Sequence, residues 1–115
     1  MKTHRLVLTE DLNQFGYLFG GRLLAWVDEA SWIAATLDFP DCQFVTIGMD
    51  KVTFKHSVQK GEIIEICCTQ KQKGNTSVGY QVEVYRGKEQ TGESIFSTLV
   101  TFVNVDELGN KAKIG

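Results

Sequence analysis

The sequence has little proline, little cysteine and no excess of basic residues. It contains one Pro and three Cys in 115 residues, and its 12 Lys and Arg against 14 Asp and Glu leave a formal net charge of −2. A single proline gives no sign of a disordered linker. A slightly acidic chain has no global basic field to hold nucleic acid. We therefore expect no nucleic-acid partner and a single domain over residues 1–115.

Long hydrophobic runs are also missing. No stretch approaches the roughly 20 apolar residues that a membrane-spanning helix needs, and no secretory signal is evident. With three Cys, this favours a reducing compartment, so we expect a cytoplasmic protein without a membrane partner. Adjacent Cys67 and Cys68 point to opposite faces of a strand, and they lack metal-ligand spacing with His4 or His56. We expect structural thiols and no metal site.

The hydrophobic pattern changes from helical to strand-like at Pro40. Apolar residues recur at helical spacing from Tyr17 to Leu37, which predicts one long helix that ends before Pro40. Alternating runs predict five strands, over residues 3–8, 44–54, 61–71, 77–85 and 94–105. One helix with a run of antiparallel strands predicts an α+β fold, a sheet wrapped on the helix.

Alternation within the strands predicts which side chains share a face. Val45, Ile47 and Met49 are expected on one side of the second strand, and a second apolar set comprises Val78, Tyr80, Val82 and Val84. A turn is expected at residues 73–75, a polar loop at 86–92 and a polar tail at 107–115.

The stretch from Asn13 to Asp28 suggests chemistry. Gly20 and Gly21 open the predicted helix, where free backbone N–H groups can bind a developing negative charge and glycine permits close approach. Asp28 has mostly apolar neighbours one turn away, so it should be partly desolvated and more basic. Oxyanion donors, a polar side chain such as Asn13 and a carboxylate are the parts of a hydrolytic site.

Each of these residues also has a structural interpretation. Gly20 could serve a turn or close packing, Asn13 a turn or cap, and Asp28 could be a solvated helix acid. Thr46 could simply be a β-branched strand residue. A serine nucleophile is disfavoured because the chain has only two histidines to act as its base.

The same stretch resembles the signature of the hotdog-fold acyl-CoA thioesterases, Asn-x-x-Gly-x-x-Phe-Gly-Gly followed after six residues by Asp. The matching positions are Asn13, Gly16, Phe19, Gly20, Gly21 and Asp28. The resemblance covers nearly the whole chain, because it continues at residues 44–46, 54, 61–62, 73–78 and 102–106.

The resemblance implies a hotdog fold, an antiparallel sheet around one long central helix, and hydrolysis of acyl-CoA to a free acid and CoA. It implies Asp28 as general base or nucleophile, and leaves that choice open. Gly20, with Gly21, would supply the oxyanion donor, and Asn13 would bind the thioester carbonyl or orient water. Thr46 matches a threonine that lies near the site in the family.

The resemblance also implies how CoA is held and how subunits assemble. The family hairpin that helps to hold the nucleotide and phosphates of CoA corresponds here to Lys73, Gly74, Asn75, Thr76 and Ser77. No metal or organic cofactor is implied, since CoA is part of the substrate. A homodimer is the implied minimum, with a tetramer or hexamer as the larger form.

Two alternatives share this fold. One is a non-catalytic acyl-CoA or lipid-binding protein, in which Asp28 lacks a correctly placed partner. The other is a hotdog hydratase, which typically uses a histidine with an acid; residues 16–39 contain no histidine. The chain also departs from the family pattern: no proline follows Phe54, Gly61-Glu62 replaces the commoner Gly-Asp, and the tail is short.

Overall fold

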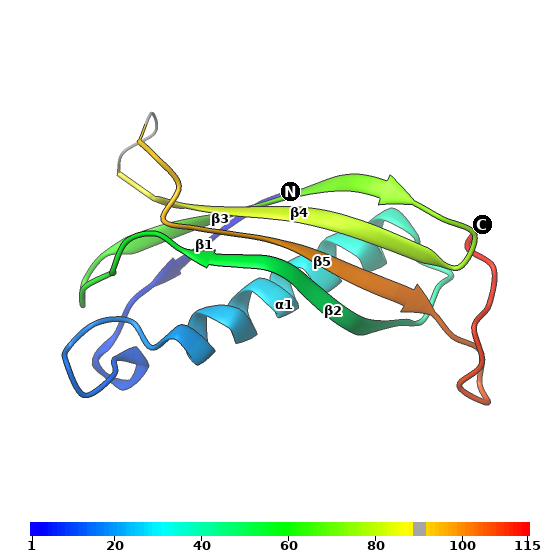
Figure 1. The fold of residues 1–115 in the computed structure, drawn as a ribbon, viewed down its shortest axis with the longest axis horizontal. Helices are drawn as coiled ribbons and strands as arrows, with labels where there is room; N and C mark the ends of the chain where they lie inside the picture. Colours follow the sequence, from blue (N-terminus) through cyan, green and yellow to red (C-terminus); the bar gives the residue numbers. More distant parts are fainter. Residues whose placement is uncertain (89–91) are drawn as a thin grey trace.

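The computed structural model describes residues 1–88 and 92–115, so part of the loop expected at 86–92 lies outside the described residues. One long helix packs against an antiparallel sheet, which confirms the expected α+β architecture (Figure 1). The helix α1 spans Gly20–Asp38, and a one-turn 3-10 helix spans Thr9–Asp11. The strands are β1 (Lys2–Leu6), β2 (Phe44–Phe54), β3 (Ile63–Lys73), β4 (Ser77–Arg86) and β5 (Phe96–Asn104).

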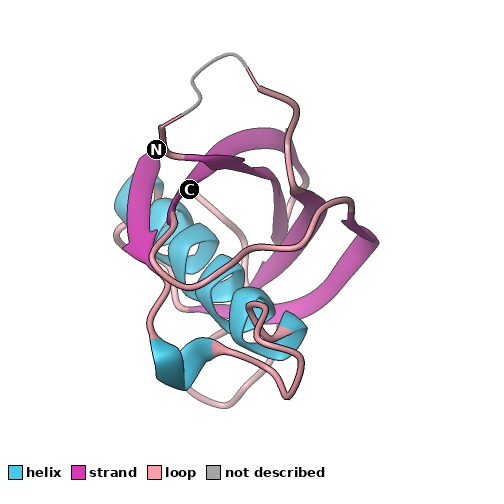
Figure 2. Ribbon diagram, turned by 90° about the vertical axis from the view of Figure 1, so that its left-hand side faces the viewer, coloured by secondary structure: helices cyan, strands magenta, loops and turns pink. Residues whose placement is uncertain are grey.

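The strands lie in the order β1-β3-β4-β5-β2, and every neighbouring pair is antiparallel. β1 and β2 therefore form the two edges of the sheet. An end-on view shows the sheet curling around α1, which runs along its inner face (Figure 2). No helix in the described ranges is long and apolar enough to cross a membrane.

The core lies between α1 and the inner face of the sheet. The expected apolar face of β4 is confirmed, because Val78, Tyr80, Val82 and Val84 are all buried there. Small residues on α1 meet them, namely Ala30, Ala34 and Ala35, and these allow the helix to approach the strands closely. Burial of a valine or larger apolar side chain contributes about 1.5–3 kcal/mol, so this interface stabilises the fold.

The prediction for β2 was wrong in one respect. Register shifts between Thr46 and Gly48, and again after Asp50, mark bulges in this strand. Val45 pairs with Val103 on the outer face, whereas Met49 pairs with Val100 and packs against the core. An extra residue in a strand reverses the alternation beyond it, so Val45 and Met49 do not share a side.

The helix begins at Gly20 rather than at Tyr17. Tyr17 forms an isolated antiparallel bridge with Gln59, and Leu18 forms one with Leu12. These pairings hold the segment extended, although its apolar residues continue the helical spacing. The expected polar tail is also more structured than its composition suggests, because Ile114 is buried.

Candidate active site

The first turn of α1 leaves backbone donors free. The N–H groups of Arg22 and Leu23 both donate to the Phe19 carbonyl, at 3.0 and 3.1 Å. The N–H groups of Gly20 and Gly21 have no acceptor among residues 1–88 and 92–115. Unpaired donors and the helix dipole together favour an anion at this point, as the sequence predicts.

Asp11 fixes the position of this helix start, a role the sequence analysis missed. Its buried carboxylate accepts a hydrogen bond from the Leu8 N–H at 2.9 Å and lies 3.4 Å from the Arg22 Nε. Its backbone carbonyl accepts the Phe19 N–H at 2.9 Å. An acid three residues after the start of a short turn is a capping signal that could have identified it.

Asn13 uses one of its two polar side-chain atoms within its own turn. Its Oδ1 accepts hydrogen bonds from the N–H groups of Phe15 and Tyr17, at 2.9 and 3.1 Å. Because only the amide oxygen can accept, these contacts fix its orientation. The Nδ2 group has no partner among the described residues, so it is free to donate to a carbonyl or a water. The turn and the predicted binding role are therefore compatible.

A cavity of about 300 Å³ brings Asn13 and Gly20 to one place. Its apolar wall comprises Leu18, Leu23, Phe54 and Val58. A Cβ on Gly20 would lie 3.4 Å from the Phe54 ring, so the glycine permits close packing beside the cavity. Both interpretations of Gly20, packing and donor, thus apply at the same position. Phe54, which the sequence places in the family resemblance but not among the site residues, also lines the cavity.

Asp28 and Thr46 form a second cluster. The Thr46 hydroxyl donates to Asp28 Oδ1 at 2.7 Å, and Asp28 Oδ2 has no hydrogen-bond or ion-pair partner in the described part of the chain. Thr46 pairs with Phe102 and so shares its inward face, which aims the hydroxyl at α1. One turn further along α1, Trp32 Nε1 donates to the Phe44 carbonyl at 3.0 Å and holds the helix against β2. The carboxylate is therefore oriented and partly exposed.

The two clusters lie apart within one chain. Asp28 follows Gly20 by eight residues, about 12 Å along a helix axis. The sequence therefore identified residues that the fold gathers into two groups: Asn13 with Gly20 and Gly21, and Asp28 with Thr46. The oxygen and carbon of one thioester carbonyl are bonded to each other, so one chain does not bring both groups to the same carbonyl.

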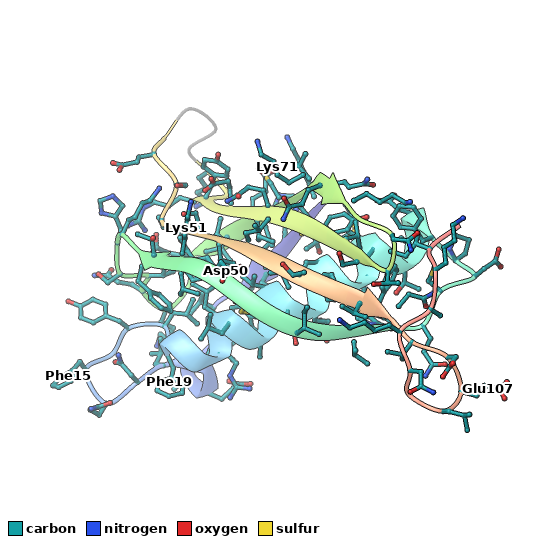
Figure 3. The ribbon with its side chains drawn as sticks, turned by 45° about the vertical axis from the view of Figure 1, so that its right-hand side comes forward. Phe15, Phe19, Asp50, Lys51, Lys71 and Glu107 are labelled. Carbon is teal, nitrogen blue, oxygen red and sulfur yellow. The ribbon has the colours of Figure 1, made fainter. Side chains whose placement is uncertain are left out.

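The predicted CoA-binding hairpin lies far from the cavity of its own chain. Ser77 is level with Val103 on β5, whereas Phe54 is level with Phe96, seven residues or about 23 Å along the strand. Figure 3 shows Phe15 and Phe19 at one end of the molecule and Glu107 at the other.

The hairpin is held by the C-terminal tail. The Ile114 N–H donates to the Asn75 carbonyl and the Asn104 N–H to the Thr76 carbonyl, both at 2.9 Å. The Gly74 N–H closes the turn by donating to the Ser77 carbonyl at 2.8 Å. Lys73 lies with its Nζ 6.0 Å from the centre of the Phe39 ring.

The thiols and His4 lie outside both clusters, whereas His56 lines the cavity together with Asn13 and Gly20. Burial, followed by a hydrogen bond to the Glu65 carboxylate, raises the pKa of Cys67 to about 11, and burial raises the pKa of Cys68 to about 11. His4 contacts Glu65, and His56 contacts a glutamate on the opposite loop. Residues 1–88 and 92–115 include no group of three or more His, Cys, Asp or Glu arranged to hold a metal.

Comparison with known proteins gives the family. Residues 15–93 match the sequence model of the thioesterase superfamily. The chain belongs to the thioesterase superfamily.

Individual members of the thioesterase superfamily align with most of the chain. The chain is 32% identical over 111 residues to the acyl-CoA thioester hydrolase YciA of Escherichia coli, and the alignment covers 90% of this chain and 82% of that protein. An uncharacterized acyl-CoA thioester hydrolase of Zymomonas mobilis is 31% identical over 104 residues, covering 89% and 69%.

A solved structure supports the same relationship. The hexameric hotdog fold thioesterase of Campylobacter jejuni superposes with a TM-score of 0.85 at 36% identity, covering 98% of this chain and 88% of that one. The hotdog fold and the thioester-hydrolase class expected from the sequence are thereby confirmed. The roles of Asp28, Asn13, Gly20, Gly21 and Thr46 stay predictions.

Proposed function

We propose that the protein hydrolyses the thioester of acyl-CoA to a free carboxylic acid and CoA. The names of its thioesterase relatives and its family support this activity. In the general-base scheme, Asp28 takes a proton from water, the water oxygen attacks the carbonyl carbon, and the C–S bond breaks as the proton passes to sulfur. In the nucleophilic scheme, Asp28 attacks the carbonyl carbon, and the C–S bond breaks to release CoA, whose sulfur takes up a proton. Water then hydrolyses the resulting anhydride to the free acid and restores the Asp28 carboxylate.

The observation that carries the proposal is the pair formed by Asp28 and Thr46. Thr46 occupies one carboxylate oxygen and leaves the other free at a partly exposed position. A base must reach its target within hydrogen-bond distance or through one water. Gly20, which shares its cavity with Asn13, lies about 12 Å away along the helix axis of the same chain. We therefore propose that each site combines Asp28 of one subunit with Gly20 and Asn13 of a second.

A two-fold axis can satisfy this requirement for helix and sheet together. Leu24 lies midway between Gly20 and Asp28, and Asp50 lies midway between Thr46 and Phe54. Gly20 lies beside Phe54, and Asp28 binds Thr46, so α1 and β2 run antiparallel in contact. A two-fold axis that passes level with Leu24 and Asp50 would place Asp28 and Thr46 of one subunit beside Gly20 and Phe54 of the other. Because isologous contacts are reciprocal, it would produce two equal sites.

The edge of β2 supports such pairing. Val45 and Ile47 on this edge strand are 42% and 61% exposed. An apolar sheet edge is a template for pairing with another chain. The homodimer is thus the smallest active unit of the proposal, with a tetramer or hexamer as the larger form; the Campylobacter relative is hexameric.

The substrate's CoA moiety fits the same arrangement. The hairpin of residues 73–77 lies at the opposite end of the sheet from its own chain's cavity, so antiparallel pairing turns it toward the end where the second subunit's cavity lies. Lys73 and the turn N–H groups of this hairpin suit phosphate oxygens. The proposed reaction needs no metal or organic cofactor, and a cytoplasmic location stays a prediction.

The decisive experiment measures thiol release from a panel of acyl-CoAs of different chain length. Wild-type protein should release CoA, and Asp28→Asn, which preserves shape but removes the base, should lose about 10²–10⁴-fold in kcat. The variant should stay folded and still bind acyl-CoA. A folded variant within threefold of wild type would exclude Asp28 as the base or nucleophile. Intact acyl-CoA across the panel, checked by mass spectrometry, would instead favour the non-catalytic binding protein.

A further inference from the structure

An ion pair far from Asp28 lies at the beginning of a hydrogen-bonded chain that ends at Asn13. Arg86, the last residue of β4, uses one guanidinium nitrogen to bind Glu62 Oε1 and the other to bind the Ser57 carbonyl at 3.2 Å. Glu62 Oε2 accepts the Gln59 N–H at 2.6 Å. Together, these three contacts hold residues 57–59 against the end of β4. Both side chains of the pair are partly buried, at 30% and 28% exposed.

Residues 57–59 in turn hold the segment that carries the Asn13 turn. The Leu18 N–H donates to the Val58 carbonyl at 2.7 Å, and Tyr17 pairs with Gln59. The Tyr17 N–H donates to Asn13 Oδ1 at 3.1 Å, and its carbonyl accepts the Asn13 N–H at 2.7 Å. The position of Asn13 therefore depends on residues 57–59 through consecutive hydrogen bonds.

The same loop also forms a wall of the cavity. Ser57 and Val58 line it together with Asn13 and Gly20. Backbone contacts also hold the loop: Gly61 and Glu62 contact Val7, the Glu62 N–H donates to the Gln59 carbonyl at 3.3 Å, and the His56 N–H donates to the Ile95 carbonyl at 3.3 Å. The Arg86–Glu62 pair adds side-chain contacts to Ser57 and Gln59, so it contributes to the orientation of this wall relative to the donors.

We propose that Arg86 and Glu62 are positioning residues that keep Asn13 and the cavity wall in the geometry the substrate requires. The inference deepens the proposed function and rests on it, since Asn13 is taken as a donor to the thioester. Neither residue lines the cavity, so neither is proposed as a catalytic group. Small displacements of oriented groups cost about 10²-fold in rate, so an indirect effect on kcat is expected.

The chain offers a matched control. Arg5 on β1 also forms an ion pair with a glutamate, Glu29 on α1, and it too joins two elements. That pair has no link to residues 57–59. Arg5→Ala and Arg86→Ala therefore remove equivalent charges, and only the second is expected to disturb Asn13.

The test compares kinetics and amide hydrogen exchange of these variants. Arg86→Ala should lower kcat by about 10- to 100-fold with a smaller change in KM. It should speed exchange of the Tyr17 and Leu18 amides at least about tenfold, whereas Arg5→Ala should change neither kcat nor those amides by more than about twofold. Arg86→Lys, which keeps the charge but binds only one acceptor well, should recover part of the activity. Glu62→Ala with Arg86→Ala should lose no more than the worse single variant, because both act through one chain of contacts.

Three results would overturn the inference. They are unchanged exchange of Tyr17 and Leu18 in Arg86→Ala, additive losses in the double variant, and an equal effect of Arg5→Ala. Failure of the proposed function is distinguishable, because a wild-type protein that hydrolyses no acyl-CoA leaves the amide-exchange comparison intact.

Discussion

At the scale of single residues, the donors at the start of α1 matter because a backbone N–H cannot be removed by an ordinary substitution. Gly20 is the first residue of the helix, and Phe19 before it has φ −67° and ψ 130°. Proline is tolerated at the first helical position, and the residue before it must be extended, as Phe19 is. Gly20→Pro therefore removes the N–H while keeping the helix.

Gly20→Ala is the control, because it adds a Cβ beside Phe54 but keeps the N–H. Loss of one oxyanion donor costs about 10²–10³-fold in kcat, so the proline variant should fall below the alanine variant by about that factor. Steady-state kinetics on both variants, with circular dichroism to confirm the helix, decide the point. Equal kcat values would assign Gly20 to packing alone.

The raised pKa of Cys67 predicts slow chemical labelling. Its thiol has a pKa of about 11 against an ordinary 9.0, because burial and the Glu65 carboxylate both disfavour the thiolate. At pH 8 the reactive thiolate is thus about 100-fold scarcer than in a free thiol. In a variant with Cys42→Ser and Cys68→Ala, which keeps Cys67 as its one thiol, DTNB should label the protein about that much more slowly than a small free thiol. Labelling at the rate of the free thiol would show that Cys67 is not shielded.

At the scale of elements, the sequence was most reliable where one physical cause dominates. The buried face of β4 follows from simple alternation, and Val78 to Val84 lie as predicted. The turn before Gly20 and the bulges of β2 depend on pairings that local pattern does not encode, such as Tyr17 with Gln59. The family resemblance predicts that Asp28 and Thr46 both lie near the site, and the two residues are in contact. The positioning role of Arg86 and Glu62 could not be predicted in this way, because it depends on a loop distant in sequence from the Asn13 turn.

Two buried side chains hold the C-terminal tail, Ile114 and the polar Asn104. Asn104 is 7% exposed; its Oδ1 accepts the Gln43 N–H at 2.8 Å, and its Nδ2 donates to the carbonyls of Ala112 and Lys113 at 3.3 and 3.2 Å. Asn104→Ala leaves these groups unpaired and should lower the free energy of unfolding by about 2–3 kcal/mol.

The matched variant is Asn110→Ala, an exposed asparagine in the same tail. Its side chain has no hydrogen bond among the described residues, so a change within about 0.5 kcal/mol is expected. Urea denaturation of both variants provides the comparison. Equal stabilities would mean that the tail is not held by Asn104.

At the scale of the whole molecule, the separation of the two clusters predicts complementation between subunits. Asn13→Ala and Asp28→Ala should each be nearly inactive, because every site in either homodimer carries one lesion. In a mixed dimer with a shared site, one site carries both lesions and the other carries neither. Random assortment of equal amounts makes about half of the dimers mixed, and each has one intact site of two, so activity should recover to roughly a quarter of wild type.

The measurement is the rate of CoA release after the two variants are unfolded and refolded together, with native mass spectrometry to count mixed dimers. Each variant refolded alone serves as the control for recovery by refolding itself. If Asn13 and Asp28 served the same subunit's site, every site in a mixed dimer would retain a lesion. Mixed dimers without recovered activity would therefore exclude the shared site.

The same experiment with Asp28→Ala and Thr46→Ala should give no recovery, because these two residues are joined within one chain. In that mixed dimer, one site carries Asp28→Ala and the other carries Thr46→Ala, so neither site is intact.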